Sequence, residues 1–499
     1  MLKQILHLCL IAAVSGSFLF LSCPAAIPNE PGHDDVESPV GLYDADAPLD
    51  TKADASAFDD GKMKYIILND SGTLQSQLTE RNTIYEIKSV FDLGESGGSA
   101  TIPDGCILKF SGGCLRNGTI TGNDTIIEAP LYQIFDNCTL KGFNQPLHSR
   151  WWCVLDGRDN TAALQCAFNS VGSMGTLILD RGYHLVHETI TVPDNCIQII
   201  GDHENGMYPT SDIVFDTTSG TCLFVTRHAS LPTITISGIG IFGKTNSNEK
   251  TTEGKFGYYP ETTAIDVTNN SLSPNIHMSN CRIEHFAYII KTNPNSYYNS
   301  FNSCRFFYFG KALFGFHANN LSIVDCRITN GYQFLYLASG DGQTTIDKCS
   351  IENLTGRIIE TGTSIGKLTL SNSYIELAEP SERFIYGNIK NLSLTNNEIQ
   401  NNGCWRTIEI TAPITMILQG NHWRFDKNHN NFSNGAIITD HETRGNLQVF
   451  VWMDSFQNMP SSSGFSSTYT PLTTLRSAGN NSMSYGCDPV SGNQVQLIP

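Results

Sequence analysis

The stretch N-I-H-M-S-N-C-R-I-E at residues 275–284 begins a repeat that decides the fold. Related segments follow at intervals of 22 to 24 residues, among them N-S-F-N-S-C-R-F-F (299–307), L-S-I-V-D-C-R-I-T (321–329) and L-T-L-S-N-S-Y-I-E (368–376). The position that we call the anchor is occupied in turn by Cys281, Cys304, Cys326, Cys349, Ser373, Asn397 and Asn421. Such a period indicates one supersecondary unit that is stacked on copies of itself.

The units alternate between apolar and polar side chains with a period of two residues. In the unit of Cys326, the apolar positions are Leu321, Ile323 and Ile328. This period predicts strands rather than helices. We therefore expect an all-β solenoid in which the anchors form one inward column, with about 4.8 Å between neighbouring rungs.

The chain contains 15 cysteines. We expect the four anchor cysteines to form a column of buried free thiols, because a bridge between neighbouring rungs would disturb the parallel stacking. Whether other cysteines pair is left open by the sequence. These are Cys106, Cys114, Cys138, Cys153 and Cys166.

The first residues are typical of an export signal. Lys3 is followed by a mainly apolar run to Leu21, and the run ends F-L-S-C at Cys23. This ending resembles a bacterial lipobox, although Phe20 stands where Leu is commoner. We predict lipidation of Cys23 and a lipoprotein on the outer membrane or cell surface of a Gram-negative bacterium. The alternative is an ordinary secretion signal that leaves a periplasmic or secreted protein.

The rest of the chain divides by composition and period. We predict a signal peptide (1–22), a flexible stalk (23–60), small β-coils (61–150), the main β-helix (151–450) and a Ser/Thr/Asn-rich tail (451–499). Leu164, Ala167, Phe168 and Val171 share one helical face, which predicts an amphipathic helix that caps the main coil. Asp159 or Asn160 can cap its start and Gly172 its end. The repeat pattern fades after Phe425.

The net charge of the chain argues against one class of binding partner. The formal net charge is −17, and only 16% of the residues are charged. Because an acidic chain repels phosphate backbones, we expect no nucleic-acid partner.

Three motifs before the repeat resemble the entry segment of pectate-lyase-like proteins. They are D-G-R-D-N-T-A-A-L-Q (156–165), G-T-L-I-L-D-R-G-Y (175–183) and V-P-D-N-C-I-Q-I-I-G (192–201). The resemblance implies a right-handed parallel β-helix, and many members of this superfamily act on polysaccharides. The N-T-D, D-D, G-H-G and R-I-K signatures of its polygalacturonase branch are missing from the strands, so no catalytic residue can be transferred.

The strand after the anchor presents one column of guanidinium groups. Arg282, Arg305 and Arg327 each follow an anchor directly. Stacked cations favour an anionic partner, such as a carboxylated or sulfated glycan. The alternative is pairing with Glu284 and other acids on a solvated face.

Aromatic residues form a second candidate binding set. Tyr258 and Tyr259 lie in a long insertion between Gly243 and Glu261, and Tyr297 and Tyr298 lie in the loop before the Cys304 rung. Aromatic faces stack on sugar rings, but they also pack loops onto a scaffold.

Acidic residues are scarce in the strand before the anchor, where Asp347 is the only acid in the outward columns. Asp347 and Glu352, which flank Cys349, are the candidate acid/base pair. The sequence shows no metal site; calcium is expected only if the protein is a lyase.

We expect an exported, lipid-anchored protein that binds a polysaccharide, acidic if the arginine column is used, and that cleaves it if it is a lyase or glycoside hydrolase. The alternative is a non-catalytic glycan-binding or adhesive surface protein.

Overall fold

The computed structural model describes part of the unit Lys62–Pro499. The described residues are 63–94, 98–202, 210–226, 233–246, 257–268, 275–377, 381–402, 404, 406–410, 415–425, 437–440, 448–452, 454–457, 470–476 and 484–487. The predicted signal peptide, Cys23 and the predicted stalk lie outside them.

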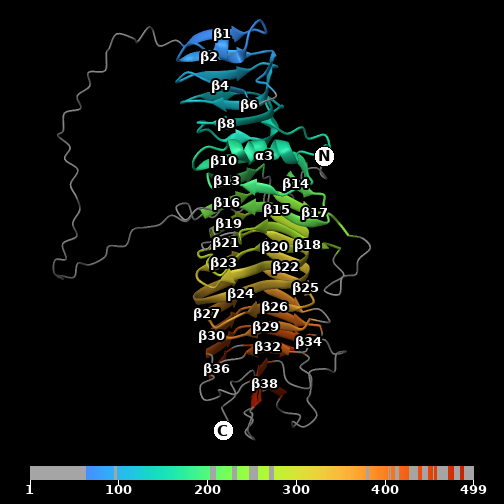
Figure 1. Ribbon diagram of the computed structural model, residues 1–499. Coiled ribbons are helices and arrows are strands. Elements are labelled where there is room, and N and C mark those ends of the chain that lie inside the picture. Colours follow the sequence, from blue (N-terminus) through green and yellow to red (C-terminus); the bar gives the residue numbers. More distant parts are fainter. Residues whose placement is uncertain are drawn as a thin grey trace, which may run out of the picture. The chain divides into compact units, whose positions relative to one another are not determined.

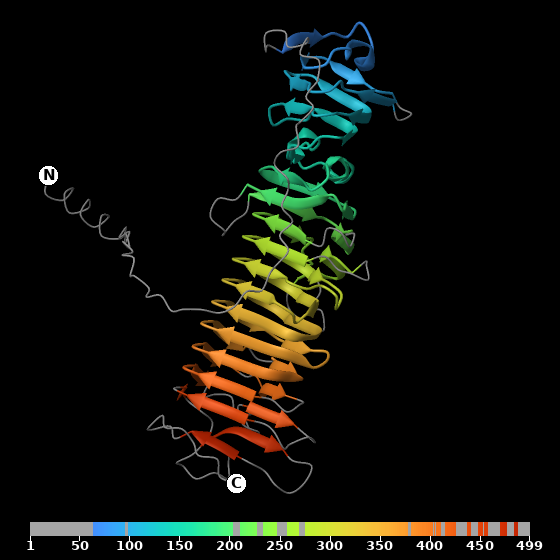
Figure 2. The same cartoon turned by 90° about the vertical axis from the view of Figure 1, so that its left-hand side faces the viewer.

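Parallel strands stack rung on rung and form three faces, which Figures 1 and 2 show from two sides. The predicted all-β parallel β-helix is therefore confirmed. The first face contains β10 (Gly175–Leu179), β13 (Cys196–Gly201), β16 (Thr233–Ser237), β19 (Asn275–Ser279), β21 (Ser300–Asn302), β23 (Leu321–Val324), β27 (Ile365–Ser371), β30 (Ile389–Thr395), β33 (Thr415–Gln419) and β36 (Gln448–Trp452).

The second face follows the anchor. It contains β11 (Gly182–Val186), β14 (Ser211–Phe215), β17 (Gly240–Gly243), the first parts of β20 (Arg282–Lys291), β22 (Arg305–His317) and β24 (Arg327–Asp347), and then β25 (Ser350–Leu354), β28 (Tyr374–Leu377), β31 (Glu398–Asn401), β34 (His422–Phe425) and β37 (Ser455–Gln457).

The third face completes each rung. It contains β12 (Ile190–Val192), β15 (Ser219–Val225), β18 (Tyr259–Asp266), the later parts of β20, β22 and β24, and then β26 (Arg357–Thr361), β29 (Arg383–Gly387), β32 (Arg406–Ile410), β35 (Ile437–Asp440) and β38 (Thr470–Arg476). β24 also returns to the first face, where Asp347 pairs with Ser371. β38 pairs in addition with β39 (Ser484–Cys487), which runs antiparallel to it.

The ladder continues beyond the point where the repeat pattern fades. β34 pairs with β37, and β35 pairs with β38, both in parallel. Strand pairing thus extends into the segment that we predicted as a Ser/Thr/Asn-rich tail, because backbone pairing tolerates side chains that break the apolar pattern.

The N-terminal strands build narrower coils. One sheet consists of β1 (Lys64–Leu68), β2 (Thr83–Ile87), β5 (Ile107–Phe110) and β7 (Ile126–Glu128), with the short helix α2 (Leu74–Gln77) after β1. The other consists of β3 (Val90–Asp92), β4 (Gly98–Thr101), β6 (Cys114–Thr121) and β8 (Phe135–Lys141). β9 (Leu147–His148), followed by the 3-10 turn η1 (Ser149–Trp151), pairs with β10 of the main coil.

The predicted helix is α3 (Thr161–Ser170), and Leu164 and Phe168 on it are fully buried, as expected. Its position differs from the expectation of a terminal cap. The helix contacts both β8 and β12, so it lies between the N-terminal coils and the main coil. The hydroxyl of Ser170 accepts a hydrogen bond from the amide of Leu140 in β8 at 2.9 Å.

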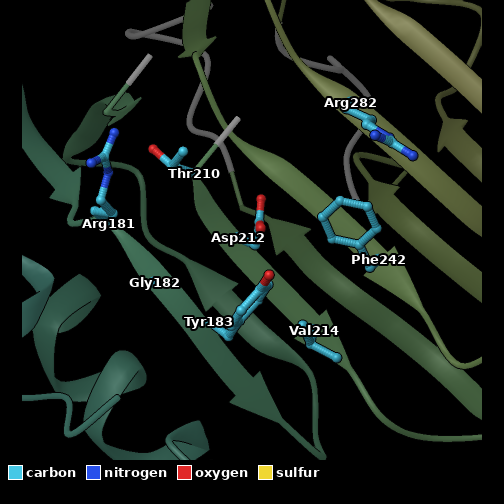
Figure 3. A pocket seen from close by; sticks show the side chains of 8 residues that line it. All are labelled: Arg181, Gly182, Tyr183, Thr210, Asp212, Val214, Phe242 and Arg282. Carbon is cyan, nitrogen blue, oxygen red and sulfur yellow. The ribbon is translucent and has the colours of Figure 1, made fainter. Parts of the chain in front are cut away.

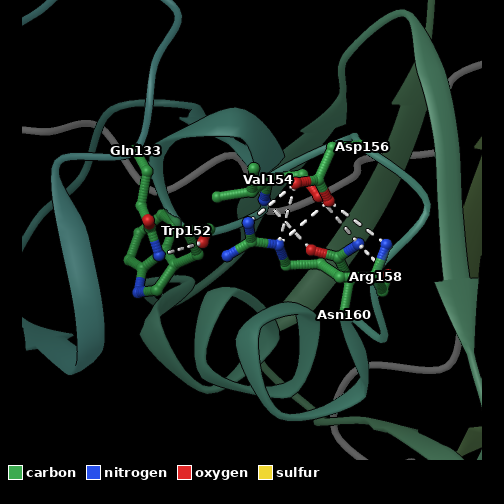
Figure 4. Close-up of polar contacts among 6 residues, drawn as sticks. All are labelled: Gln133, Trp152, Val154, Asp156, Arg158 and Asn160. Carbon is green, nitrogen blue, oxygen red and sulfur yellow. Dashed lines mark hydrogen bonds and ion pairs between the residues drawn. The ribbon is translucent and has the colours of Figure 1, made fainter.

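The segment before α3 is held by the side chain of Asn160 (Figure 4). Its amide group accepts from the Val154 N–H at 3.0 Å and donates to the Val154 carbonyl at 3.1 Å. Asn160 therefore ties the loop and does not cap the helix. Asp159 supplies the local cap, because its carboxylate accepts from the Thr161 N–H at 2.9 Å.

From β16 to β33, each rung turns from the first to the second face at a residue with positive φ, which directly precedes the anchor or, in the β16 rung, Ile239. The φ angles of these residues lie between 50° and 67°. They are Gly238, Asn280, Ser303, Asp325, Lys348, Asn372, Asn396 and Gly420. Gly, Asn and Asp adopt this conformation at low cost, which explains their recurrence in the repeat.

The anchors form one buried column, as predicted. All seven are at most 3% exposed. The amide of Cys304 donates to the Sγ of Cys326 at 3.4 Å, and the amide of Cys349 donates to the Oγ of Ser373 at 3.0 Å. The amides of Ser373 and Asn397 donate in the same way, at 3.0 Å, to the Oδ1 of the next asparagine.

The twelve cysteines whose side chains are described are free thiols, including the four anchors. The expected thiol column is therefore confirmed, and Cys106, Cys114, Cys138, Cys153 and Cys166 form no disulfide with one another.

The anchor column gives a first prediction. Asn397→Ala removes the acceptor of the buried Ser373 amide and two donor contacts of the Asn397 side chain. An unsatisfied buried amide costs about 1–3 kcal/mol. The midpoint of thermal unfolding, followed by circular dichroism, should therefore fall by several degrees.

Asn397→Ser is the matched control, because Ser373 already performs the same role for the amide of Cys349. We expect this variant to keep most of the lost stability. Equal midpoints for the alanine and serine variants would contradict the proposed acceptor role.

Candidate functional site

The outer side of the second face carries the predicted arginine column. Arg282 pairs in register with Arg305, and Arg305 pairs with Arg327. Three further rungs extend the column toward the N-terminus, where Arg282 pairs with Gly240, Gly240 with Asp212 and Asp212 with Tyr183.

Arg282 and Arg327 have carboxylate partners. Arg282 donates from Nε and Nη2 to Glu284 at 3.2 and 3.0 Å, and its guanidinium lies 5.7 Å from the Phe242 ring centroid. Arg327 lies 3.8 Å from Glu352. The Arg327 side chain is 49% exposed, whereas that of Arg282 is 23% exposed. The column is therefore partly neutralised, and its binding role stays a prediction.

A hollow of ≈ 670 Å³ lies at the N-terminal end of this column. It is lined by Arg181, Gly182, Tyr183, Thr210, Asp212, Val214, Phe242 and Arg282 (Figure 3). The carboxyl group of Asp212 lies among the side chains of Thr210, Tyr183 and Phe242. Tyr183 is 67% exposed, so its ring is available at the rim. A concave site with apolar walls and a few polar groups is typical of a small-molecule or sugar site.

Gly240 leaves the space in which the Asp212 carboxyl group lies. A Cβ atom on Gly240 would come within 2.2 Å of Asp212 Oδ1 and within 2.6 Å of the Phe242 ring. The missing side chain thus interrupts the outward column between Asp212 and Arg282.

Asp212 is the chemically distinctive group of the hollow. The residue is only 6% exposed, and its Oδ1 is buried with no hydrogen-bond partner among the described residues. Burial raises the pKa of Asp212 to about 7; Arg282 opposes this shift, and Glu284 adds to it. Because ionised and protonated forms coexist near neutrality, this carboxyl group can donate or accept a proton.

A buried polar network lies beneath the strands of the hollow. The Nδ1 of His184 lies 3.2 Å from the Asp212 carbonyl oxygen, and its Nε2 lies 2.8 Å from the Ser149 hydroxyl. Ser149 also accepts from the Asp180 N–H at 2.9 Å. His184 and Ser149 are fully buried, and burial lowers the pKa of His184 to about 4. This network fixes β11 and β14 against η1 and exposes no nucleophile.

The predicted acid/base pair lies elsewhere. Asp347 ends β24 on the first face, whereas Glu352 lies in β25 on the second face. Burial acts to raise the pKa of Asp347. Hydrogen bonds from Ser371 (2.7 Å) and Asn372 (2.8 Å) outweigh burial, and the pKa is lowered. Glu352 pairs with Arg327. Neither residue lines the hollow, and their catalytic role stays a prediction.

The four predicted tyrosines are not brought together with the hollow. Tyr258 is 2% exposed and packs against Ala287, and Tyr259 begins β18 on the third face. Tyr297 lies against His317, with ring centroids 4.5 Å apart. Tyr298 is 59% exposed in the turn before β21.

Tyr183, Asp212 and Gly240 were missed by reasoning from sequence. Asp212 is an acid inside the apolar strand S-D-I-V-F (211–215), and that is a usable signal for a functional position. Asp212 lies on a rung before the regular repeat, so the repeat does not predict that Asp212 and Arg282 belong to the same outward column.

No helix of the described residues is long and apolar enough to span a membrane. Within the same residues, no group of three or more His, Cys, Asp and Glu side chains is placed to hold a metal ion. The calcium requirement of a lyase stays untested.

Comparison with known proteins gives a likeness to solved structures only. No family model matches the chain, and neither does any curated protein. The tailspike protein of Acinetobacter phage vB_ApiP_P1 is similar at 13% identity over 71% of this chain, with a TM-score of 0.46. The Dettilon tailspike protein is similar at 12% identity over 62% of this chain, with a TM-score of 0.39.

The enzymatically active domain of bacteriophage CBA120 tailspike protein 2 is similar at 14% identity over 64% of this chain, with a TM-score of 0.34. This chain spans 63%, 62% and 42% of the lengths of these three proteins, in the order given. The resemblance to pectate-lyase-like proteins stays a prediction, since no family model matches.

The raised pKa of Asp212 predicts a pH-dependent effect on stability. The ordinary pKa is 3.8 and the folded value is about 7, so the folded state binds a proton that the unfolded state releases. Stability is therefore lost as pH rises from about 4 to about 7. Asp212→Asn should unfold at the wild-type temperature at pH 4 and about 2–4 °C higher at pH 8.

Asp347→Asn is the control of opposite sign, because the pKa of Asp347 is lowered. This variant should be less stable than wild type at pH 8, and the deficit should shrink in acid. Thermal melts from pH 4 to 8 measure both. A pH-independent difference for Asp212→Asn would show that its carboxyl group is not held partly protonated.

Proposed function

We propose that this is an exported protein that binds a polysaccharide on its second face, with the hollow at Asp212 as the principal contact. The observation that carries the proposal is a concave site with an exposed aromatic ring, an apolar floor and a buried carboxyl oxygen that lacks a partner. The acidic glycan and the lipid anchor at Cys23 remain part of the proposal.

The lining suits a sugar ring. Val214 and Phe242 offer apolar surface to the C–H face of a pyranose, and the Tyr183 ring can cover it from the rim. Asp212 can hydrogen-bond a sugar hydroxyl in either protonation state. The hollow lies at one end of the Arg282, Arg305 and Arg327 column, so an extended acidic chain would place its carboxylates or sulfates along these cations.

The number of carboxyl groups in the lining of the hollow favours binding over cleavage. Its lining contains one carboxyl group, that of Asp212. The usual glycoside hydrolysis requires two carboxyl groups on either side of the scissile bond.

Tyr183→Ala tests the binding site. If a sugar stacks on this ring, affinity should fall about tenfold in calorimetric titration with the best ligand from a panel of acidic and neutral glycans. Tyr65→Ala is a matched control, because Tyr65 is 49% exposed on β1 outside the hollow. A loss of affinity for Tyr298→Ala but not for Tyr183→Ala would favour the loop that we predicted from sequence instead.

Cleavage is the second candidate, and the raised pKa of Asp212 favours it. Protonated Asp212 would give its proton to the glycosidic oxygen as the C–O bond breaks, and water would supply the hydroxyl at the anomeric carbon. Glu284, whose charge acts on Asp212, is the candidate acceptor of the water proton. Its pairing with Arg282 would have to loosen for this step.

Reducing-end release from each bound glycan decides between the two. If the protein is a hydrolase, Asp212→Asn should lower kcat at least about a hundredfold while binding persists. The rate of the wild type should fall above pH 7, as the acid ionises. Absence of reducing ends and of unsaturated ends for every glycan bound by wild type would leave only the binding function.

A further inference from the structure

The third face carries a cluster of aromatic rings and lysines that lies apart from the hollow. We call it the aromatic–lysine patch and define it as Tyr288, Lys291, Lys311, Phe314 and Tyr336. Tyr288 pairs in register with Lys311, and the outward column beside it runs from Lys291 through Phe314 to Tyr336. All five side chains are half-buried, whereas the residues between Tyr288 and Lys291 and between Lys311 and Phe314 are buried, so the five point outward.

The three rings contact one another across neighbouring rungs. Phe314 and Tyr336 stack with centroids 4.8 Å apart and an interplanar angle of 17°. Tyr288 meets Phe314 edge-on at 5.4 Å. Because the rings are anchored on paired strands, their spacing is fixed before any ligand arrives.

The two lysines have aromatic rather than acidic neighbours. Lys311 Nζ lies 4.8 Å from the Phe314 centroid and 5.7 Å from that of Tyr288, and Lys291 Nζ lies 5.5 Å from Tyr288. Neither lysine forms an ion pair among the described residues, whereas Lys64, Lys88, Lys109, Lys244 and Lys390 all do.

The acids next to the patch are engaged elsewhere. Asp266, the register partner of Lys291, accepts from the amide and hydroxyl of Thr268 at 2.8 and 2.7 Å. Glu360, the register partner of Tyr336, accepts from Gln333 at 2.7 Å and pairs with Arg357 at 2.6 Å. In a chain of net charge −17, the patch thus contains two cations that have no carboxylate partner within the described ranges.

We propose that the aromatic–lysine patch is a second binding site for an acidic polysaccharide, distinct from the hollow. A sugar ring would pack against the outer edges of the stacked Phe314 and Tyr336 rings, and its carboxylate or sulfate would contact Lys291 and Lys311. The two lysines favour an acidic polysaccharide over a neutral one. Aromatic side chains that repeat along a sheet suit a ligand made of repeated sugar rings.

The test uses the full chain with Gly240→Ala, because the added Cβ would displace the Asp212 carboxyl group and the Phe242 ring of the hollow and so separate the two sites. Oligogalacturonate and dextran sulfate serve as acidic probes, and neutral dextran serves as the uncharged probe. Lys291→Gln/Lys311→Gln should weaken binding of at least one acidic probe about tenfold, since one charge-assisted contact is worth that much. Lys291→Arg/Lys311→Arg should restore most of it, and added salt should weaken wild-type binding.

Lys64→Gln/Lys390→Gln is the charge-matched control, because both lysines are exposed and paired outside the patch. An equal loss for this control would mean that only net charge matters and would overturn the proposal. It would also be overturned if neither acidic probe binds the Gly240→Ala protein, or if neutral dextran binds it as tightly. Binding at the hollow is judged separately, from Tyr183→Ala in the chain with Gly240, so either site can fail alone.

Discussion

The structure depends on one buried hydrogen bond that is repeated at the corner between the first and second faces. There the backbone amide of an anchor residue points into the coil, and the anchor side chain of the next rung accepts it, as Ser373 does for Cys349 and Asn421 for Asn397. The column ends with Asp454, which accepts from the Asn421 amide at 2.8 Å. A buried amide without a partner costs about 1–3 kcal/mol, so each rung requires a small side chain with an acceptor atom. Cys, Ser, Asn and Asp share that property.

This requirement explains how far the sequence could be read. The repeat predicted the strands, the inward column and the pairing of Arg282 with Arg305, because one period set every register. It treated Cys281 and its successors as small hydrophobes, whereas the Sγ of Cys326 also accepts an amide. The helix face of Phe168 was predicted correctly, but its place between two coils was not. Periodicity identifies a buried face without showing what covers it.

The hollow escaped prediction for two physical reasons. Its rungs, β11, β14 and β17, lie before the regular repeat, and Gly240 is 42 residues from its register partner Arg282, so the period of 22 to 24 residues does not relate Asp212 to Arg282. The positions of Asp212 and Phe242 in its lining also depend on the absence of a side chain at Gly240, and a glycine in a strand is equally consistent with a bulge or a tight turn. The raised pKa of Asp212 follows from burial, which no local pattern of residues reports.

The two proposed binding surfaces share the strands β20, β22 and β24, which bend around the corner between the second and third faces. Each strand begins with an arginine of the column. Further along, β20 and β22 each contribute one aromatic residue and one lysine to the patch, and β24 contributes Tyr336. The bend lies at residues with positive φ, and there His285 and Tyr308 stack at 4.9 Å with an interplanar angle of 4°. Aromatic rings therefore also cover the corner that separates the arginines of the second face from the lysines of the third face.

Because one hydrogen-bonded register sets the spacing of all of these groups, a ligand chain that crosses the corner would meet cations and aromatic rings on rungs about 4.8 Å apart. If both proposed sites bind, such a surface would select for an extended, repeating, anionic partner without requiring any single deep pocket.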